Sequence, residues 1–183
     1  MRLHEGLKAE LVRYEPCDSL EARHRTAILD LLALGGEVLG RGHFTPGHIT
    51  ASCFILDEEG ESLLLHHHRR LDRWLQMGGH LEPGETAVAA ALREGAEESG
   101  LPDLTLVFDG IFDVDVHAIP AGKGEPDHQH FDVRYLARTR TPAAIALDPG
   151  ESLRLDWIAL DHAEELMNEK ASSRVIGKIR RLT

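Results

Sequence analysis

The sequence predicts a mixed α/β (α+β) fold in which helices pack on a sheet. Along the chain, a helical stretch is followed by two strand-like stretches, a second helix, further strands and a last helix. The 183 residues, 42% of them hydrophobic, are enough for one domain with its own core. No internal repeat or low-complexity segment interrupts this order. We therefore expect one domain that carries at most a short appendage.

The first half of the chain contains a predicted helix and a predicted hairpin. Residues 18–34 form the helix, which Asp18 or Ser19 can cap and which Gly35-Gly36 ends. The stretches "ITASCFIL" (49–56) and "SLLLHHH" (62–68) are rich in β-formers and flank the turn "DEEG", as in a hairpin. We expect residues 1–45 to form an N-terminal helical extension and 46–183 to form the main domain.

The second half of the chain also combines predicted helices with predicted strands. Residues 86–99 have the pattern of a helix, and Gly100 and Pro102 end it. The remaining elements are expected to be strands at 104–109, 111–118, 131–138 and 153–159, followed by a last helix over 161–181.

Composition excludes several classes of protein. A formal net charge of −11 argues against a duplex nucleic-acid partner, which needs a basic face, although metal ions could still supply positive charge for a phosphate substrate. No run of about 18 apolar residues predicts a membrane span, and the charged start does not resemble a signal peptide. Cys17 and Cys53 form no disulfide framework. We expect a cytoplasmic protein with no membrane partner.

Carboxylates gather on the helix expected at 86–99. Glu94, Glu97 and Glu98 are spaced i, i+3 and i+4, so they share one helical face. Such like-charge spacing destabilises a helix by roughly a few tenths of a kcal/mol, unless a cation lies between the charges. Hard divalent cations such as Mg²⁺ bind oxygen ligands, and Arg93 adjoins the group. From spacing alone, the group is either a cation site or a solvated acidic face.

The segment before this helix favours the cation site. Gly78-Gly79 predicts a tight turn whose free carbonyl can face a metal. The stretch "EPGE" then leads into the helix and places Glu85 near its positive N-terminus.

The whole stretch resembles the Nudix box, Gly-x5-Glu-x7-Arg-Glu-U-x-Glu-Glu-x-Gly-U, in which U is a bulky aliphatic residue. The matching positions are Gly79, Glu85, Arg93, Glu94, Glu97, Glu98, Gly100 and Leu101. The one departure is Gly95, which stands where the family has an aliphatic residue. Glycine within a helix costs roughly 1 kcal/mol relative to alanine, so we expect Gly95→Ala to be tolerated and to stabilise the protein.

The resemblance implies a fold, a cofactor and roles for residues. The fold would be a Nudix-like α/β/α sandwich with a mixed sheet and the N-terminal helical extension. Mg²⁺ or Mn²⁺ would be held by Glu94, Glu97, Glu98 and the carbonyl of Gly79. Glu94 would also orient or deprotonate the attacking water with help from Arg93, and Glu85 would support the loop. The family reaction is hydrolysis of a nucleoside diphosphate linked to another moiety.

Two further strands carry polar residues at alternate positions. In "HQHFDVRYLA", His128, His130, Asp132 and Arg134 share one face, and "IFDVDVHA" presents Asp113, Asp115 and His117 in the same way. If the two strands pair, their polar faces become adjacent. That face is either a wet outer surface or the wall of a substrate cleft. In the cleft, His128 and His130 would contact phosphate or bind a further metal as neutral imidazoles.

Other candidates for substrate binding lie around the hairpin. Arg69, Arg70 and Arg73 can match the geometry of phosphate. His80 follows Gly79 directly and is expected at the cleft, although His80 and His48 could both be exposed loop residues. Trp74 is interpreted as packing rather than as a base-stacking platform.

Two alternatives to a hydrolase stay open. A non-catalytic nucleotide sensor of the same family is disfavoured because every box carboxylate is kept. An enzyme similar to isopentenyl diphosphate isomerase is disfavoured because Gln76 to Gly79 stand where that family has a cysteine before Gly-His. The substrate within the class, the oligomeric state (monomer or homodimer) and a metal ligand outside the box are not determined by the sequence.

Overall fold

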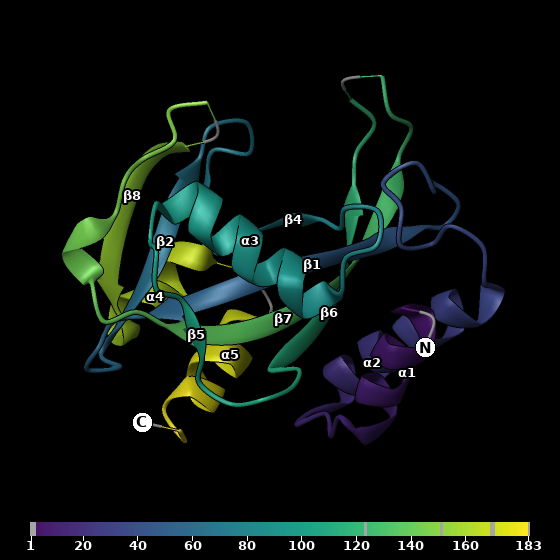
Figure 1. The fold of residues 1–183 in the computed structure, drawn as a ribbon, viewed down its shortest axis with the longest axis horizontal. Coiled ribbons are helices and arrows are strands. Elements are labelled where there is room, and N and C mark those ends of the chain that lie inside the picture. The colour runs from purple at the N-terminus through teal and green to yellow at the C-terminus, as the bar shows by residue number, and fades with distance from the viewer. Residues whose placement is uncertain (1–2, 123, 151, 169–170, 183) are drawn as a thin grey trace. The chain divides into compact units, whose positions relative to one another are not determined.

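The computed structural model describes residues 3–122, 124–150, 152–168 and 171–182 (Figure 1). The helices are α1 (Leu3–Arg13), α2 (Ser19–Leu34), α3 (Ala87–Ser99), α4 (Leu160–Met167) and α5 (Ser172–Ile179), with a 3-10 turn at Pro142–Ala144. The strands are β1 (Gly47–Leu56), β2 (Ser62–His68), β3 (Arg73–Leu75), β4 (Met77–His80), β5 (Thr105–Leu106), β6 (Asp113–Ile119), β7 (His128–Arg138) and β8 (Ser152–Ala159). The α+β class expected from the sequence is confirmed.

The strands form one sheet with the hydrogen-bonded order β3-β2-β1-β7-β5, and β4, β6 and β8 pair with β1, β7 and β2 respectively. The expected hairpin of β1 and β2 is confirmed, with Ile55 opposite Leu64. The strands β6 and β7 are antiparallel neighbours, and Asp115 lies opposite Asp132.

By its internal contacts the chain divides into two compact units. The first unit comprises Met1–Ser52, Gly79–Ala91 and Gly110–Tyr135. In it, α1 packs against α2, and α2 packs on β6 (Figure 1). Leucine and isoleucine side chains of α2 are buried, and His24 Nδ1 lies 3.2 Å from a carboxylate oxygen of Asp115. The boundary between an extension and a main domain at residue 45 stays a prediction.

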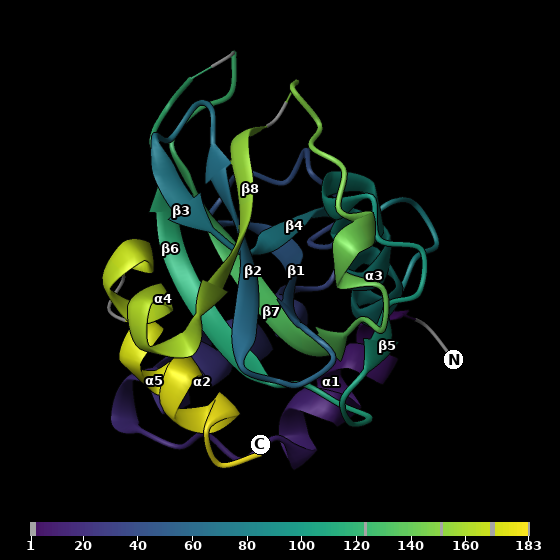
Figure 2. The ribbon, with the colours of Figure 1, turned by 90° about the vertical axis from the view of Figure 1, so that its left-hand side faces the viewer.

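The second unit comprises Cys53–Gly78, Leu92–Asp109 and Leu136–Thr183. In it, β2 pairs with β3 and β8, and α4 contacts all three strands as well as α5. Figure 2 shows α4 and α5 together on one side of β2 and β8. The described residues contain no helix that is long and apolar enough to cross a membrane.

Several expected boundaries are right and others are wrong. The helix at 18–34 is confirmed, and Asp18 caps it by accepting the N–H of Glu21. The single last helix is wrong: α4 ends at Asn168, whose left-handed backbone turns the chain, and α5 begins at Ser172. The strand expected at 104–109 is reduced to Thr105–Leu106. Gly78-Gly79 is no turn, because both residues are extended within β4.

Gly95 lies where α3 approaches β1. A Cβ atom at Gly95 would be 3.0 Å from Leu104 Cδ1 and 3.3 Å from Cys53 Cβ. Cys53 is fully buried. The stabilisation expected for Gly95→Ala assumed open space that the fold does not provide.

The polar face shared by β6 and β7 is not the wet outer surface that alternation allowed. Arg134, Asp132 and Asp113 are almost completely buried on it. Arg134 Nε donates to Asp132 at 2.8 Å, and its terminal nitrogens lie 3.4 Å from Asp113 and 3.2 Å from Asp115. Burial opposes the charge of Arg134, but the aspartates outweigh this effect and raise its pKa. The face is therefore an internal ion network.

Candidate functional site

Arg93 organises the carboxylates of α3. Its Nη1 atom lies 3.0 Å from Glu94 Oε1 and 3.1 Å from Glu97 Oε2. The Glu97 side chain is 62% exposed, whereas Glu94 and Arg93 are mostly covered. One guanidinium thus holds two carboxylates of the box on the same helical face, as their spacing predicts.

Glu98 lies deeper than a solvated acidic face would place it. Only 7% of the residue is exposed, and its Oε2 atom accepts the backbone N–H of Gly78 at 3.0 Å. This bond ties α3 to β4 just before Gly79. A carboxylate is rarely buried unless its charge is compensated, so the simple reading of a charged outer helix face applies to Glu97 alone.

Glu85 closes the loop before α3. Its Oε2 atom accepts the N–H of Glu82 at 2.9 Å, and its own N–H donates to the carbonyl of Glu82 at 3.0 Å. Thr86 Oγ1 then accepts the N–H of Ala89 at 3.3 Å at the start of the helix. These two hydrogen bonds of Glu85 hold the shape of the loop 82–85.

The donor atoms on α3 are of the type that a hard divalent cation binds. Three carboxylates on one helix offer oxygen ligands only, which Mg²⁺ and Mn²⁺ prefer. A backbone N–H holds Glu98 in place, and Arg93 holds Glu94, so both carboxylates already have a fixed orientation.

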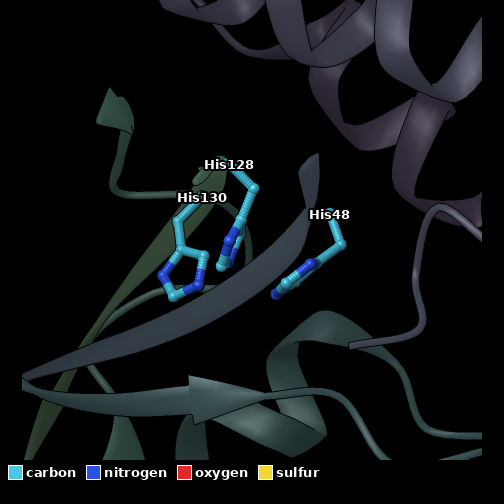
Figure 3. Close-up of side chains that lie close together, drawn as sticks. All are labelled: His48, His128 and His130. Carbon is cyan, nitrogen blue, oxygen red and sulfur yellow. The ribbon is translucent and has the colours of Figure 1, made fainter. Parts of the chain in front are cut away.

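Four histidines form a second group, which we call the histidine cluster: His48, His80, His128 and His130. The His48 ring lies 5.0 Å from His80, 5.1 Å from His128 and 4.9 Å from His130, between ring centroids. Figure 3 shows the rings of His48, His128 and His130 pointing toward one another. His48 is fully buried within β1, so its interpretation as an exposed loop residue is wrong.

Burial favours the neutral form of three rings of this cluster, those of His48, His80 and His130. It lowers the pKa of His48 and lowers the pKa of His80 to about 4. The pKa of His130 falls to about 2, through burial first and then through the neighbouring histidines. Neutral imidazoles do not attract phosphate by charge, so contact of phosphate with His80 or His130 would have to come from hydrogen bonds or from a bound metal.

The three arginines that were proposed to bind phosphate lie in the turn between β2 and β3 and at the start of β3. Arg69 and Arg70 occupy the turn, and Arg69 Nε donates to the carbonyl of Pro149 at 3.1 Å. Arg73 begins β3 and is exposed. Nothing ties these residues to a substrate, and their role stays a prediction. Trp74 is half-buried, stacks on His67 and lies under Arg154, which supports packing.

Sequence reasoning missed the part that β1 contributes. His48, Thr50 and Ser52 alternate along β1 and share a face, and both hydroxyls donate to Asp132, at 2.9 Å from Thr50 Oγ1. The period-two run of polar residues inside a strand was the available signal. It was obscured because every residue of β1 is buried, so neither face appears as a surface.

Comparison with solved structures gives the class of fold. A C. elegans Ap4A hydrolase is similar over 73% of this chain and 95% of its own, with a TM-score of 0.59 and 22% identity. A Nudix-family hydrolase from Clostridium perfringens is similar over 74% of this chain and 98% of its own, with a TM-score of 0.56 and 28% identity. The chain therefore has the α+β fold of Nudix proteins. The NUDIX domain model matches residues 46–178, and the chain belongs to the Nudix family.

Curated relatives match a shorter segment. Mouse diphosphoinositol polyphosphate phosphohydrolase 3-alpha is 45% identical over 49 residues, which is 27% of this chain and 30% of the relative. Human diphosphoinositol polyphosphate phosphohydrolase 2 is 39% identical over 61 residues, 33% of this chain and 34% of the relative. The matched segments thus span about a third of the relatives' own length.

Proposed function

We propose that this protein is a divalent-metal-dependent pyrophosphohydrolase, which cleaves a nucleoside diphosphate linked to another moiety. The observation that carries the proposal is the arrangement of α3, in which Arg93 holds Glu94 and Glu97 while Gly78 N–H holds the buried Glu98. A sensor that only binds nucleotide has no need to keep such a set of carboxylates.

Each residue has a part in this reaction. Glu94, Glu97 and Glu98, with the carbonyl of Gly79, would hold Mg²⁺ or Mn²⁺. The ion supplies charge neutralisation of the pyrophosphate and makes water more acidic. Glu94, oriented by Arg93, would position or deprotonate the attacking water. Glu85 would keep the loop 82–85 in the shape that presents Gly79.

Charge and the names of the relatives guide the choice of compounds to test as substrates. With a net charge of −11, the chain relies on metal ions and on local cations to bind polyphosphate. Relatives act, by their names, on diphosphoinositol polyphosphates and on Ap4A. Test compounds therefore include dinucleoside polyphosphates, ADP-ribose, nucleotide sugars, nucleoside triphosphates and a diphosphoinositol polyphosphate. Arg69, Arg70 and Arg73 are the candidate contacts for the remoter phosphates.

The test is an activity screen of these compounds with Mg²⁺ and with Mn²⁺. The products are separated from the substrate by ion-exchange chromatography and quantified, with substrate incubated without the protein as the blank. We expect product formation that requires the divalent ion and stops with a chelator. Activity that survives complete chelation would contradict the proposal.

The matched variants are Glu97→Gln and Glu165→Gln. Glu97→Gln keeps size and polarity but removes the charge, so kcat should fall by about a hundredfold or more, in line with the several kcal/mol that a catalytic metal supplies. Glu165 is an exposed glutamate of α4, and its change to Gln should leave kcat unaltered. Circular dichroism should show the same fold for both. Equal kcat for the two variants would remove Glu97 from the metal site.

A further inference from the structure

Three imidazoles of the histidine cluster meet in one place. Each of His48, His128 and His130 offers one ring nitrogen, and these three atoms all lie within 4.8 Å of one another. His48 belongs to β1, and the other two belong to β7 (Figure 3). We propose that His48, His128 and His130 form a binding site for one transition-metal ion of the Zn²⁺ type, made of residues other than the carboxylates of α3.

The hydrogen bonds of two rings select the nitrogen that would bind the ion. His48 Nδ1 lies 3.1 Å from the carbonyl oxygen of His43, and His128 Nδ1 lies 2.8 Å from that of Pro126. A carbonyl only accepts, so each Nδ1 carries the proton and each Nε2 has a lone pair. Metal-binding histidines in proteins are oriented by this same bond from the other ring nitrogen.

His48 also presents an unsatisfied atom. Its Nε2 is buried and has no hydrogen-bond partner among the described residues. A buried polar atom without a partner costs about 1–3 kcal/mol, so such atoms are rare unless something is bound to them. A metal ion at the three nitrogens would satisfy His48 Nε2.

The backbone brings the two strands together at this point. Gln129 N–H donates to the carbonyl of Pro46 at 2.9 Å, and a Cβ atom at Gly47 would lie 1.8 Å from the carbonyl oxygen of Gln129. Only glycine allows that approach. Gly47 therefore places His48 beside His128 and His130. The backbone, rather than a movement of side chains, brings the three rings together.

The chemistry of the donors favours a metal over an anion. Neutral imidazoles carry no positive charge for phosphate, whereas they are the form that binds metal. Nitrogen donors suit Zn²⁺, Ni²⁺, Cu²⁺ or Fe²⁺, while Mg²⁺ prefers oxygen. The histidines and the box carboxylates would thus take different ions from the same solution.

Three protein nitrogens leave a coordination position for water or an anion, as in many zinc sites with three protein ligands. His80 is a further imidazole beside the site, with its ring 5.0 Å from His48 and 5.3 Å from His130. Since His80 directly follows Gly79, the site adjoins the start of the Nudix box along the chain.

The experiment measures metal binding without reference to activity. The 183-residue chain is stripped of metal and held in millimolar Mg²⁺, so that oxygen sites are filled, and Zn²⁺ is then titrated with a chromophoric competitor. X-ray absorption of the zinc form reports the ligands. We expect one tight Zn²⁺ per chain with imidazole scattering, and the same binding in a Glu97→Gln, Glu98→Gln double variant.

Removing two ligands provides the second measurement. His128→Ala with His130→Ala should weaken Zn²⁺ binding by at least about a hundredfold, because two of the three donors are lost. His67→Ala with His68→Ala removes the same number of imidazoles from β2 and should leave the affinity unchanged. Zinc bound through oxygen only, or lost in the glutamate variant alone, would overturn the proposal. The wild-type absorption spectrum decides the question even if a histidine variant fails to fold.

Discussion

Arg134 is the residue on which the interior of the first unit depends. Its side chain is 1% exposed and pairs with Asp113, Asp115 and Asp132. Removing one partner of a buried ion network leaves uncompensated charge, which typically costs about 3–5 kcal/mol. We expect Arg134→Met to lower the free energy of unfolding by about that amount in urea denaturation.

The control for this prediction is Arg180→Met. Arg180 pairs with Asp161 at 2.5 Å, but both side chains are largely exposed, and such pairs contribute about 0–1 kcal/mol. If the two variants lose equal stability, the buried network contributes no more to the free energy of unfolding than an exposed ion pair does.

His66 predicts a pH dependence of stability. It is almost completely buried in β2, and its Nδ1 lies 2.7 Å from Ser152 Oγ. Burial, followed by the charges of His68 and His67, lowers its pKa from 6.5 to about 4. Between pH 6.5 and about pH 4, His66 is therefore protonated in the unfolded chain but neutral in the folded protein. Stability contributed by neutral His66 is complete above pH 6.5 and falls as the pH drops toward 4.

The measurement is urea denaturation at pH 7.5 and at pH 5. His66→Asn retains a group that can bond Ser152 but does not titrate, so it should lose less stability than the wild type between the two pH values. His162→Asn removes an exposed imidazole of α4 and serves as the control. A wild-type stability that is flat over this interval would contradict the low pKa of His66.

At the scale of elements, Gly95 of α3 and Gly177 of α5 can be compared directly. Both lie inside helices, where Gly→Ala commonly adds about 0.5–1 kcal/mol. A Cβ at Gly177 meets nothing nearer than Arg181 Nη1 at 3.9 Å, whereas at Gly95 it would be 3.0 Å from Leu104 and 3.3 Å from Cys53. We expect Gly177→Ala to stabilise the protein and Gly95→Ala to be neutral or destabilising, by thermal melts under one condition.

A larger side chain sharpens this comparison. Gly95→Val would restore the aliphatic residue of the Nudix pattern but would overpack the contact between α3 and β1, at a cost of about 1–3 kcal/mol. Stabilisation by Gly95→Val would mean that Leu104 and Cys53 yield freely, and that the departure from the pattern has no structural cause.

Local signals account for the elements that the sequence predicts correctly. Asp18 caps α2, and the turn after Leu56 joins two strands of β-formers. Both features depend on residues that are close together in the sequence. The end of α4 also has a local signal, because asparagine is one of the residues that adopt the left-handed backbone at the end of a helix, as Asn168 does. The prediction of a single helix over 161–181 overlooked this signal.

The α3 carboxylates and the histidine cluster differ in how far apart their residues lie in the sequence. The carboxylates lie within one turn of α3, so their spacing alone predicts that they share a face. His48, His80 and His128 come from three separate strands, and only strand pairing makes them neighbours. Alternation predicted that His128 and His130 share a face of β7, but it had no means of predicting that β1 supplies the third ring.

At the scale of the whole molecule, the N-terminal helices should be needed for stability. Ile28, Leu31 and Leu32 of α2 are buried, α2 packs on β6, and His24 faces Asp115. A chain of residues 46–183 would expose that surface of β6. We expect a Tm lower by many degrees than that of the full chain, with increased binding of a hydrophobic dye. Leu31→Asp should have a similar effect without shortening the chain.

An unchanged Tm for residues 46–183 would instead show that this segment folds on its own, and that the helices before it serve another purpose. The point variant distinguishes the two cases, because a dispensable extension would also tolerate Leu31→Asp.

The burial of Cys53 beneath Gly95 has a practical consequence. The sequence has 2 cysteines, of which Cys17 is exposed and Cys53 is buried with a pKa raised to about 12. Only thiolates react with alkylating reagents, so the folded protein should acquire a single label, at Cys17. A second label requires α3 to separate from β1. The rate of that second modification, followed by mass spectrometry, therefore reports the opening of this contact in the unmodified natural sequence.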